Sequence, residues 1–277
     1  MDNDITLVLG ATGKTGRRVA ARLRLRDLPV RAASRSSATR FDWSSPAGWD
    51  AALDGVTAVY VVPPPVPGPV HEFVARAERA GARRLVLLSG HGADRWGDSG
   101  FGPDMRSAED AVRGSALDWT VVRAANFFQN FADIYRDALV AGQLALPVGA
   151  APEPFVDVED VAEAAATVLA EPGRHAEQVY ELTGPRALTF AQATELIAKA
   201  AGRPVGYRQI SAAEHIAALV EQGWSEDDAG HDAAMFSLIT DGVIAETTDD
   251  VATLLGRPPR GFEDFVVRTA ASGTWAG

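Results

Sequence analysis

The chain has 277 residues, of which 47% are hydrophobic and 23% are charged, and its formal net charge is −11. This acidic balance without a basic tract argues against a nucleic-acid backbone as the main partner, and the lack of cysteine excludes disulfides and thiolate metal sites. The start has no basic n-region, and no apolar run approaches the roughly 18 residues of a membrane span, so we predict a soluble cytoplasmic protein.

Short β-type runs alternate with helical segments in the first half of the chain. Strands are expected at 5–9, 30–33, 58–62, 85–88 and 119–122, and helices are expected at 71–80 and 104–113. The run VVPPPVPGP, residues 61–69, can be neither helix nor central strand, so we predict a stiff loop at the carboxyl end of a strand. Strand and helix in this alternation predict right-handed crossovers and a parallel sheet.

The alternation of strands and helices becomes less regular after about residue 142. Three helices are expected there, each begun by a capping residue: Asp157, Thr189 and Ser211. Two short helices are expected at 235–240 and 248–255. The pattern predicts an α/β fold, with a doubly wound parallel sheet over residues 1–150 and a smaller α+β lobe over residues 151–277 that partly returns to the sheet.

A glycine-rich stretch, ITLVLGATGKTG, follows the first strand. A triphosphate loop would need glycine at position 8, where Val8 stands. Gly10, Gly13 and Gly16 instead suit a dinucleotide: the first allows a tight turn, the second lets the backbone approach a diphosphate, and the third lets the helix pack on the strand. Their spacing, Gly-x-x-Gly-x-x-Gly, differs from the standard Gly-x-Gly-x-x-Gly fingerprint.

Cofactor preference is expected at the end of the second strand, which reads VRAASRSS. A carboxylate here would hold a ribose 2′-hydroxyl and select NAD, but the stretch contains Ser34 and Arg35 and no acid. The guanidinium of Arg35 could hold a 2′-phosphate, so NADP is predicted. The alternative is that Arg35 is a solvated loop charge.

Several stretches together resemble the NmrA-like branch of the atypical short-chain dehydrogenase/reductases. They are GATGKTGRRVA, RAASRSS, VYVVPPP, LVLLSG, SAEDAVRGSALDWTVVRAANFFQNF, LALPVGAAPEPFVDVEDVA and YELTGPRALTFAQA, so the likeness covers nearly the whole chain. Within that branch the chain is similar to bacterial relatives of the ergot-alkaloid iminium reductase and of NADPH-dependent quinone reductases. The resemblance implies a Rossmann sheet with a smaller carboxyl-terminal lobe over the nicotinamide end.

The resemblance also implies a set of cofactor contacts. The phosphates are expected at Gly10, Thr12, Gly13, Thr15 and Gly16, the 2′-phosphate at Arg35, adenine at Asp42, the ribose at Val62 and Pro63, and nicotinamide at Asn126. Lys14 in the same glycine loop, and Ser34 and Ser89 at strand ends, complete the expected cofactor contacts.

The Tyr-x-x-x-Lys pair of ordinary short-chain reductases is absent, since none of the four tyrosines has a lysine four residues on. Three outcomes are compatible with this. In the first, the substrate is an iminium or quinone that needs little acid help. In the second, Ser89 or His91, after the predicted strand 85–88, acts instead, because an imidazole titrates near neutrality. The protein could also bind NADP without turning it over, as some NmrA-like redox sensors do.

Aromatic residues are expected to line a pocket for a flat substrate. The candidates for substrate contact are Trp96, Phe101, Phe128 and Phe155. The glycine-rich run 91–103 is predicted to be a lid, and no histidine spacing indicates a metal site.

We therefore predict NADPH-dependent reduction of a C=N, quinone or conjugated C=C bond in a small, aromatic or polycyclic metabolite. The alternatives are a non-catalytic NADP(H)-sensing regulator and a cofactor-bound isomerase or cyclase. No oligomeric state is predicted.

Overall fold

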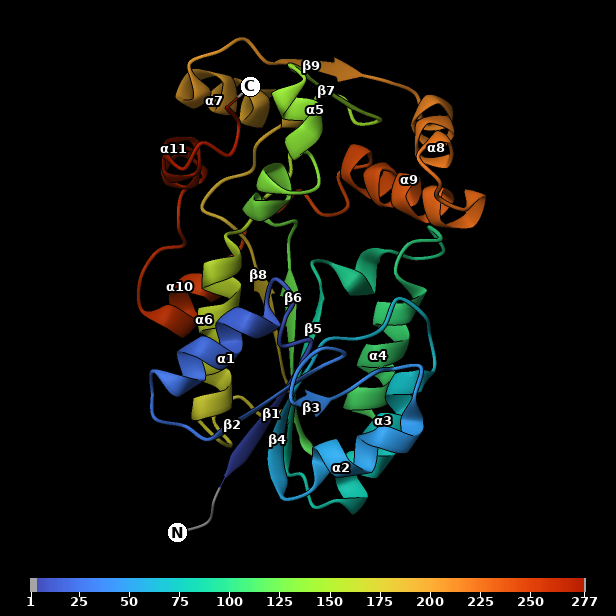
Figure 1. Ribbon diagram of the computed structural model, residues 1–277, viewed down its shortest axis with the longest axis vertical. Coiled ribbons are helices and arrows are strands. Elements are labelled where there is room, and N and C mark those ends of the chain that lie inside the picture. The colour runs from blue at the N-terminus through green and yellow to red at the C-terminus, as the bar shows by residue number, and fades with distance from the viewer. Residues whose placement is uncertain (1–3, 277) are drawn as a thin grey trace.

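Seven parallel strands form the central sheet of the protein, seen here in a computed structural model that describes residues 4–276 (Figure 1). Their order is β3-β2-β1-β4-β5-β6-β8. The strands are β1 Ile5–Leu9, β2 Val30–Ser34, β3 Thr39–Arg40, β4 Val56–Val61, β5 Arg84–Gly90, β6 Asp118–Ala124 and β8 Gln178–Leu182. The order reverses between β1 and β4, which is where doubly wound sheets hold ligands at their carboxyl edge. The predicted Rossmann-type fold is confirmed.

Helices cover both faces of this sheet (Figure 1). One face carries α1 Gly16–Arg24, α6 Val158–Ala170 and α10 Asp250–Leu255, and the other carries α2 Trp49–Leu53, α3 Pro69–Arg79 and α4 Pro103–Arg113. Because both faces are covered, β1 can be apolar throughout, and its Leu7, Val8 and Leu9 are fully buried. Two apolar cores result, one on each side of the sheet.

A smaller lobe lies beyond the carboxyl edge of the sheet (Figure 1). Its elements are α5 Arg136–Val140, β7 Gln143–Leu146, α7 Phe190–Ala201, β9 Gly206–Gln209, α8 Ala212–Glu221, α9 Glu226–Thr240 and α11 Phe262–Ala271. Strands β7 and β9 pair in parallel, and a cluster of phenylalanines fills the lobe's own core. Within residues 4–276 no helix has both the length and the apolar character that crossing a membrane requires.

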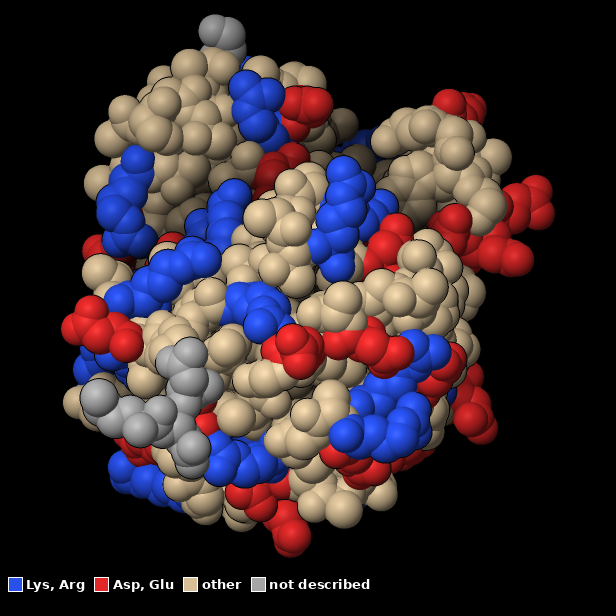
Figure 2. Space-filling model, turned by 60° about the horizontal axis from the view of Figure 1, so that its bottom comes forward, with Lys and Arg blue, Asp and Glu red and all other residues tan. Residues whose placement is uncertain are grey.

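The surface carries charges of both signs. On the face shown in Figure 2, Lys and Arg side chains are interspersed with Asp and Glu side chains.

Most predicted elements are present, with ends shifted by a residue or two. The side chain of Asp157 caps α6, and complete capping boxes begin α7 at Thr189 and α8 at Ser211. The predicted helix at 235–240 is wrong in extent, because it is only the end of α9, which begins after Ser225. An acidic first turn and a weak apolar stripe hide the first half of that helix in the sequence.

The division at residue 150 remains a prediction. The chain crosses between the two parts more than once: α5 and β7 lie in the lobe, whereas the later α6 and β8 belong to the sheet.

Candidate active site

The glycine loop joins β1 to α1 at the carboxyl edge of the sheet. Gly10 has a left-handed backbone, with φ at 63°, and its carbonyl oxygen accepts the N–H three residues on at 2.8 Å, which closes the turn. A Cβ on Gly16 would lie 2.3 Å from that carbonyl oxygen, so only glycine lets α1 start this close to β1. In the described part of the chain, the backbone N–H groups of Thr12, Lys14 and Thr15 have no hydrogen-bond partner. Such amides at a helix start are suitable donors for a diphosphate.

A basic hollow of about 240 Å³ lies beyond the ends of β2 and β3. Arg35 and Arg40 line it together with Asp42, and Arg35 makes no ion pair within residues 4–276. Hydrogen bonds from the backbone and hydroxyl of Ser44 lower the pKa of Asp42, and the nearby charge of Arg35 acts in the same direction. Two guanidinium groups beside one hollow suit a phosphate monoester. Arg40 was not among the predicted residues.

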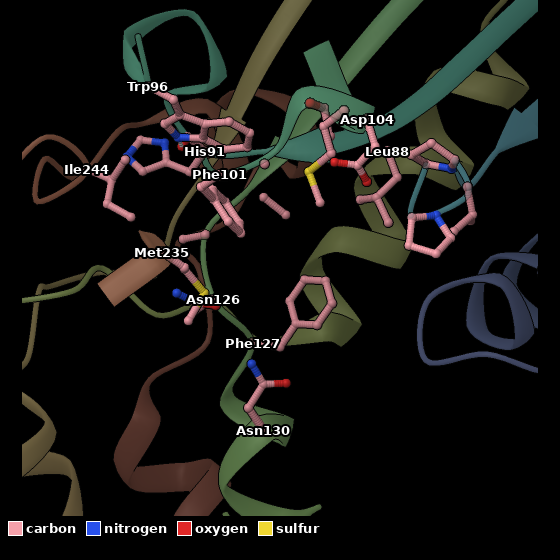
Figure 3. Close-up of a pocket in the computed structure, with 18 of the residues that line it drawn as sticks. Leu88, His91, Trp96, Phe101, Asp104, Asn126, Phe127, Asn130, Met235 and Ile244 are labelled. Carbon is pink, nitrogen blue, oxygen red and sulfur yellow. Dashed lines mark hydrogen bonds between the residues drawn. The ribbon is translucent and has the colours of Figure 1, made fainter. Parts of the chain in front are cut away.

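A cavity of about 400 Å³ lies at the carboxyl ends of β4, β5 and β6 (Figure 3). Its walls come from the β4–α3 loop, the ends of β5 and β6, the β5–α4 loop, and the lobe. Its apolar lining consists mainly of Val62, Pro63, Leu88, Trp96, Phe101, Met105, Phe127, Met235 and Ile244. The cavity brings together these residues that were singled out from the sequence: Lys14, Val62, Pro63, Ser89, His91, Trp96, Phe101 and Asn126.

Trp96 forms a fixed wall of this cavity. Its Nε1 donates to the carbonyl of His91 at 3.0 Å, and its ring packs edge-on against Phe101 at 4.9 Å between centroids. A Cβ on Gly90 or Gly102 would lie 2.5 Å or 2.2 Å from the indole ring, so both positions admit only glycine while the ring stays in place. The predicted lid is therefore packed closely around a buried tryptophan.

The imidazole ring of His91 is hydrogen-bonded to a carboxylate. Its Nδ1 lies 2.6 Å from Oε2 of Glu181 on β8, which also accepts the backbone N–H of Gly92 at 3.0 Å. Arg123 on β6 donates to Oε1 of Glu181 at 3.0 Å and pairs with both carboxylate oxygens of Glu109. Burial alone would raise the pKa of Glu181, but these hydrogen bonds outweigh it and lower the pKa. Nε2 is thus the ring nitrogen left for another partner.

Three residues that line the cavity each keep one buried polar atom without a partner in residues 4–276. These atoms are Oγ of Ser89, Nε2 of His91 and Oε2 of Glu153. The other oxygen of Glu153 accepts from the backbone and side-chain amide of Asn126 at 3.3 Å and 3.2 Å. Burial raises the pKa of Glu153 to about 8, although these hydrogen bonds partly oppose it. Buried polar atoms are normally paired, so this group points to a polar ligand.

Lys14 connects the glycine loop to the segment that follows β6. Its Nζ donates to Oδ1 of Asn130 at 2.9 Å and lies 3.0 Å from Oδ1 of Asp133. Both partners of the ion pair are partly exposed, so its net contribution to stability is small.

Two predicted substrate contacts are not in the cavity. Phe128 packs on Phe262 at 5.0 Å between ring centroids, and Phe155 packs on Phe190 at the same distance, deep in the core of the lobe. The neighbouring Phe127 lines the cavity instead, because successive residues of an extended segment point in opposite directions. The structure thus places Phe128 and Phe155 in the core of the lobe and not in the lining of this cavity.

Comparison with known proteins identifies the family to which the chain belongs. Residues 10–172 match the model of an NAD(P)H-binding family, and residues 106–266 match that of the NmrA-like family. The chain is 31% identical over 281 residues to the NAD(P)H azoreductase of Xenophilus azovorans, covering 96% of this chain and 98% of the relative. It is 28% identical over 290 residues to the agroclavine dehydrogenase of Claviceps fusiformis, covering 94% and 95%.

Among solved structures, an NADPH-dependent quinone oxidoreductase (QOR2) of Escherichia coli superimposes with a TM-score of 0.81. The two sequences are 25% identical, and the match covers 95% of this chain and 98% of the other. The chain belongs to the NmrA-like family.

Proposed function

We propose that this protein uses NADPH to reduce a C=N, quinone or conjugated C=C bond in a small, flat metabolite. The broader class, an NAD(P)H-dependent oxidoreductase, follows from the family and from the named activities of its relatives. The observation that carries the finer proposal is the cavity at the carboxyl ends of β4, β5 and β6, which combines an aromatic lining with unpartnered buried polar atoms.

The residues present fit NADP. The free amides of the glycine loop suit the diphosphate, and Arg35 with Arg40 suits the adenosine 2′-phosphate. No carboxylate stands at the end of β2, where one would hold an unphosphorylated ribose. We assign Val62 and Pro63 to the ribose and Asn126 to the nicotinamide end, because all three line the cavity.

NADPH, when bound, supplies the hydride. The protein's own part is to hold the acceptor flat against Trp96, Phe101 and Met235 and to exclude water from it. The hydroxyl of Ser89 and Nε2 of His91 are the groups that we assign to the acceptor's polar atoms, because both are buried and unpartnered. Without a Tyr-x-x-x-Lys pair, acceptors that spread or cancel negative charge suit this site best.

The test is to mix the protein with NADPH and a panel of quinones, cyclic imines and conjugated enones, and to follow the nicotinamide absorbance. We expect oxidation with at least one class, and a loss in kcat/KM of roughly 10- to 100-fold in His91→Ala through the lost hydrogen bond. His231→Ala, at an exposed position on α9, is the matched control and keeps full activity. Tight NADPH binding without oxidation by any class would overturn the proposal and favour a cofactor-sensing regulator.

A further inference from the structure

Glu153 is the least expected polar residue of the cavity. Its backbone is fixed by two hydrogen bonds of 2.9 Å with Leu188, and its side chain is fully buried. Oε1 accepts both hydrogen bonds from Asn126, and Oε2 accepts none. Within residues 4–276 no Lys, Arg or His pairs with this carboxyl group. An unpaired buried carboxylate is so costly that such a group keeps its proton instead.

The surroundings of Glu153 agree with a neutral acid. The other ionisable residues that line the cavity are Lys14, His91 and Asp104. Lys14 is paired with Asp133 and His91 is hydrogen-bonded to Glu181, so neither is a partner of Glu153. Because Oε1 already receives two N–H groups, the proton belongs on Oε2.

We propose that Glu153 is the proton donor of the reduction, and that its Oε2–H protonates the acceptor as hydride reaches carbon. This inference rests on the proposed function. His91 is held at Nδ1 by Glu181 at 2.6 Å, and we assign its Nε2 to orienting the acceptor and not to this proton transfer. Glu153 needs no extra charge in the cavity before it donates.

The atoms and electrons of this step balance. The hydride brings two electrons and one hydrogen to a carbon of the acceptor, and NADPH becomes NADP⁺. The negative charge that forms on the acceptor's oxygen or adjacent carbon takes the proton from Oε2. Glu153 is left as a carboxylate and recovers a proton from water after the product leaves. A neutral quinone or enone requires this proton, whereas an iminium cation does not, so the inferred substrates are neutral conjugated carbonyl compounds.

The first test measures protonation in the free protein, without turnover. Infrared spectra are recorded across a pH series for the parent, for Glu153→Gln and for the exposed control Glu195→Gln on α7. We expect a protonated-carboxyl band at neutral pH that titrates near pH 8, is absent in E153Q and is retained in E195Q. A spectrum at neutral pH with no such difference between the parent and E153Q would overturn the proposal.

The second test compares acceptors. With a quinone or enone, E153Q should lose roughly 10²- to 10⁴-fold in kcat at unchanged NADPH affinity, and with a cyclic iminium it should lose little. The unchanged NADPH affinity reports that E153Q is folded. Equal losses on both classes, or none on either, would overturn the role of Glu153. A parent protein that reduces neither class would overturn the proposed function itself, and the infrared titration would still report the state of Glu153.

Discussion

Under the proposed function, Arg35 selects NADPH over NADH through one charged contact. Its guanidinium stands at the end of β2 without an ion pair in the described chain, beside the hollow that Arg40 also lines. Arg35→Ala should weaken NADPH binding by roughly 10- to 100-fold, the worth of a charge-assisted hydrogen bond, and leave NADH binding nearly unchanged. Fluorescence titration measures both, with the exposed Arg136→Ala as control. Equal losses for the two cofactors would refute the phosphate assignment.

Gly16 is required because a Cβ at this position would clash, and not because the backbone needs the flexibility of glycine. Its absent Cβ would meet the Gly10 carbonyl at 2.3 Å, so Gly16→Ala must push α1 away from β1 and disorder the amides of the loop. We expect a lower melting temperature and the loss of NADPH binding, measured by thermal unfolding and calorimetry. Gly230 in α9 has open space around it, so Gly230→Ala should raise stability by up to about 1 kcal/mol. Intact NADPH binding in G16A would contradict the loop geometry.

Glu153 links stability to pH. Its folded pKa of about 8 lies above the ordinary 4.5, so the folded state holds the proton more tightly between these values. The resulting stabilisation is complete below the unfolded pKa and is lost as pH rises through the folded pKa, by about 1.4 kcal/mol per pH unit. Urea unfolding at about pH 5.5 and about pH 7.5 should therefore show the parent losing about 2–3 kcal/mol relative to E153Q. A constant difference between the two proteins would contradict a raised pKa.

Some of these residues could be predicted from the sequence and others could not. Gly16 and Arg35 occupy fixed places relative to a strand and a helix start, so spacing identifies them. Arg40 reaches the same hollow only because the two-residue strand β3 pairs with β2, which is too short to give a pattern. Glu153 carries no local signal, since its burial depends on the bridge to Leu188, far along the chain.

At the scale of elements, the carboxyl ends of β5, β6 and β8 are tied together by buried charge. The carboxylate of Glu181 is hydrogen-bonded to Arg123 and to His91, and Arg123 also pairs with Glu109. Glu181→Gln removes a mostly buried carboxylate, and because Arg123 keeps its pair with Glu109, the expected cost is about 1.5–3 kcal/mol in the free energy of unfolding, measured in urea. The exposed pair of Arg95 with Glu246 supplies the control, because Glu246→Gln should change stability by less than about 1 kcal/mol. Similar small effects for both would show that the buried network is not coupled.

The elements differ in how well the sequence predicts them. Continuous apolar runs identify the buried strands, and side-chain caps identify the starts of α6, α7 and α8. The pair β7–β9 was not predicted, because both strands are short and are joined only through tertiary structure. The lobe's helices pack on one another rather than on the sheet, so their apolar patterns are less regular.

At the scale of the molecule, the sheet and the lobe supply different parts of the candidate site. The sheet presents its glycine loop and strand ends at one edge, and the lobe covers that edge with Met235 and Ile244 (Figures 1 and 3). The sequence predicts the edge, because every parallel strand that enters a crossover ends there. It does not predict which aromatic side chains face the cavity. Phe127 and Phe128 are adjacent and identical in type, and only the local course of the backbone decides which of them points into it.

The most direct measurement is a crystal structure of the protein with NADPH bound. We expect the diphosphate on the amides of Thr12, Lys14 and Thr15, the 2′-phosphate between Arg35 and Arg40, and the nicotinamide ring in the cavity beside Ser89 and Asn126. A nicotinamide ring outside that cavity, or a 2′-phosphate away from both arginines, would contradict the account.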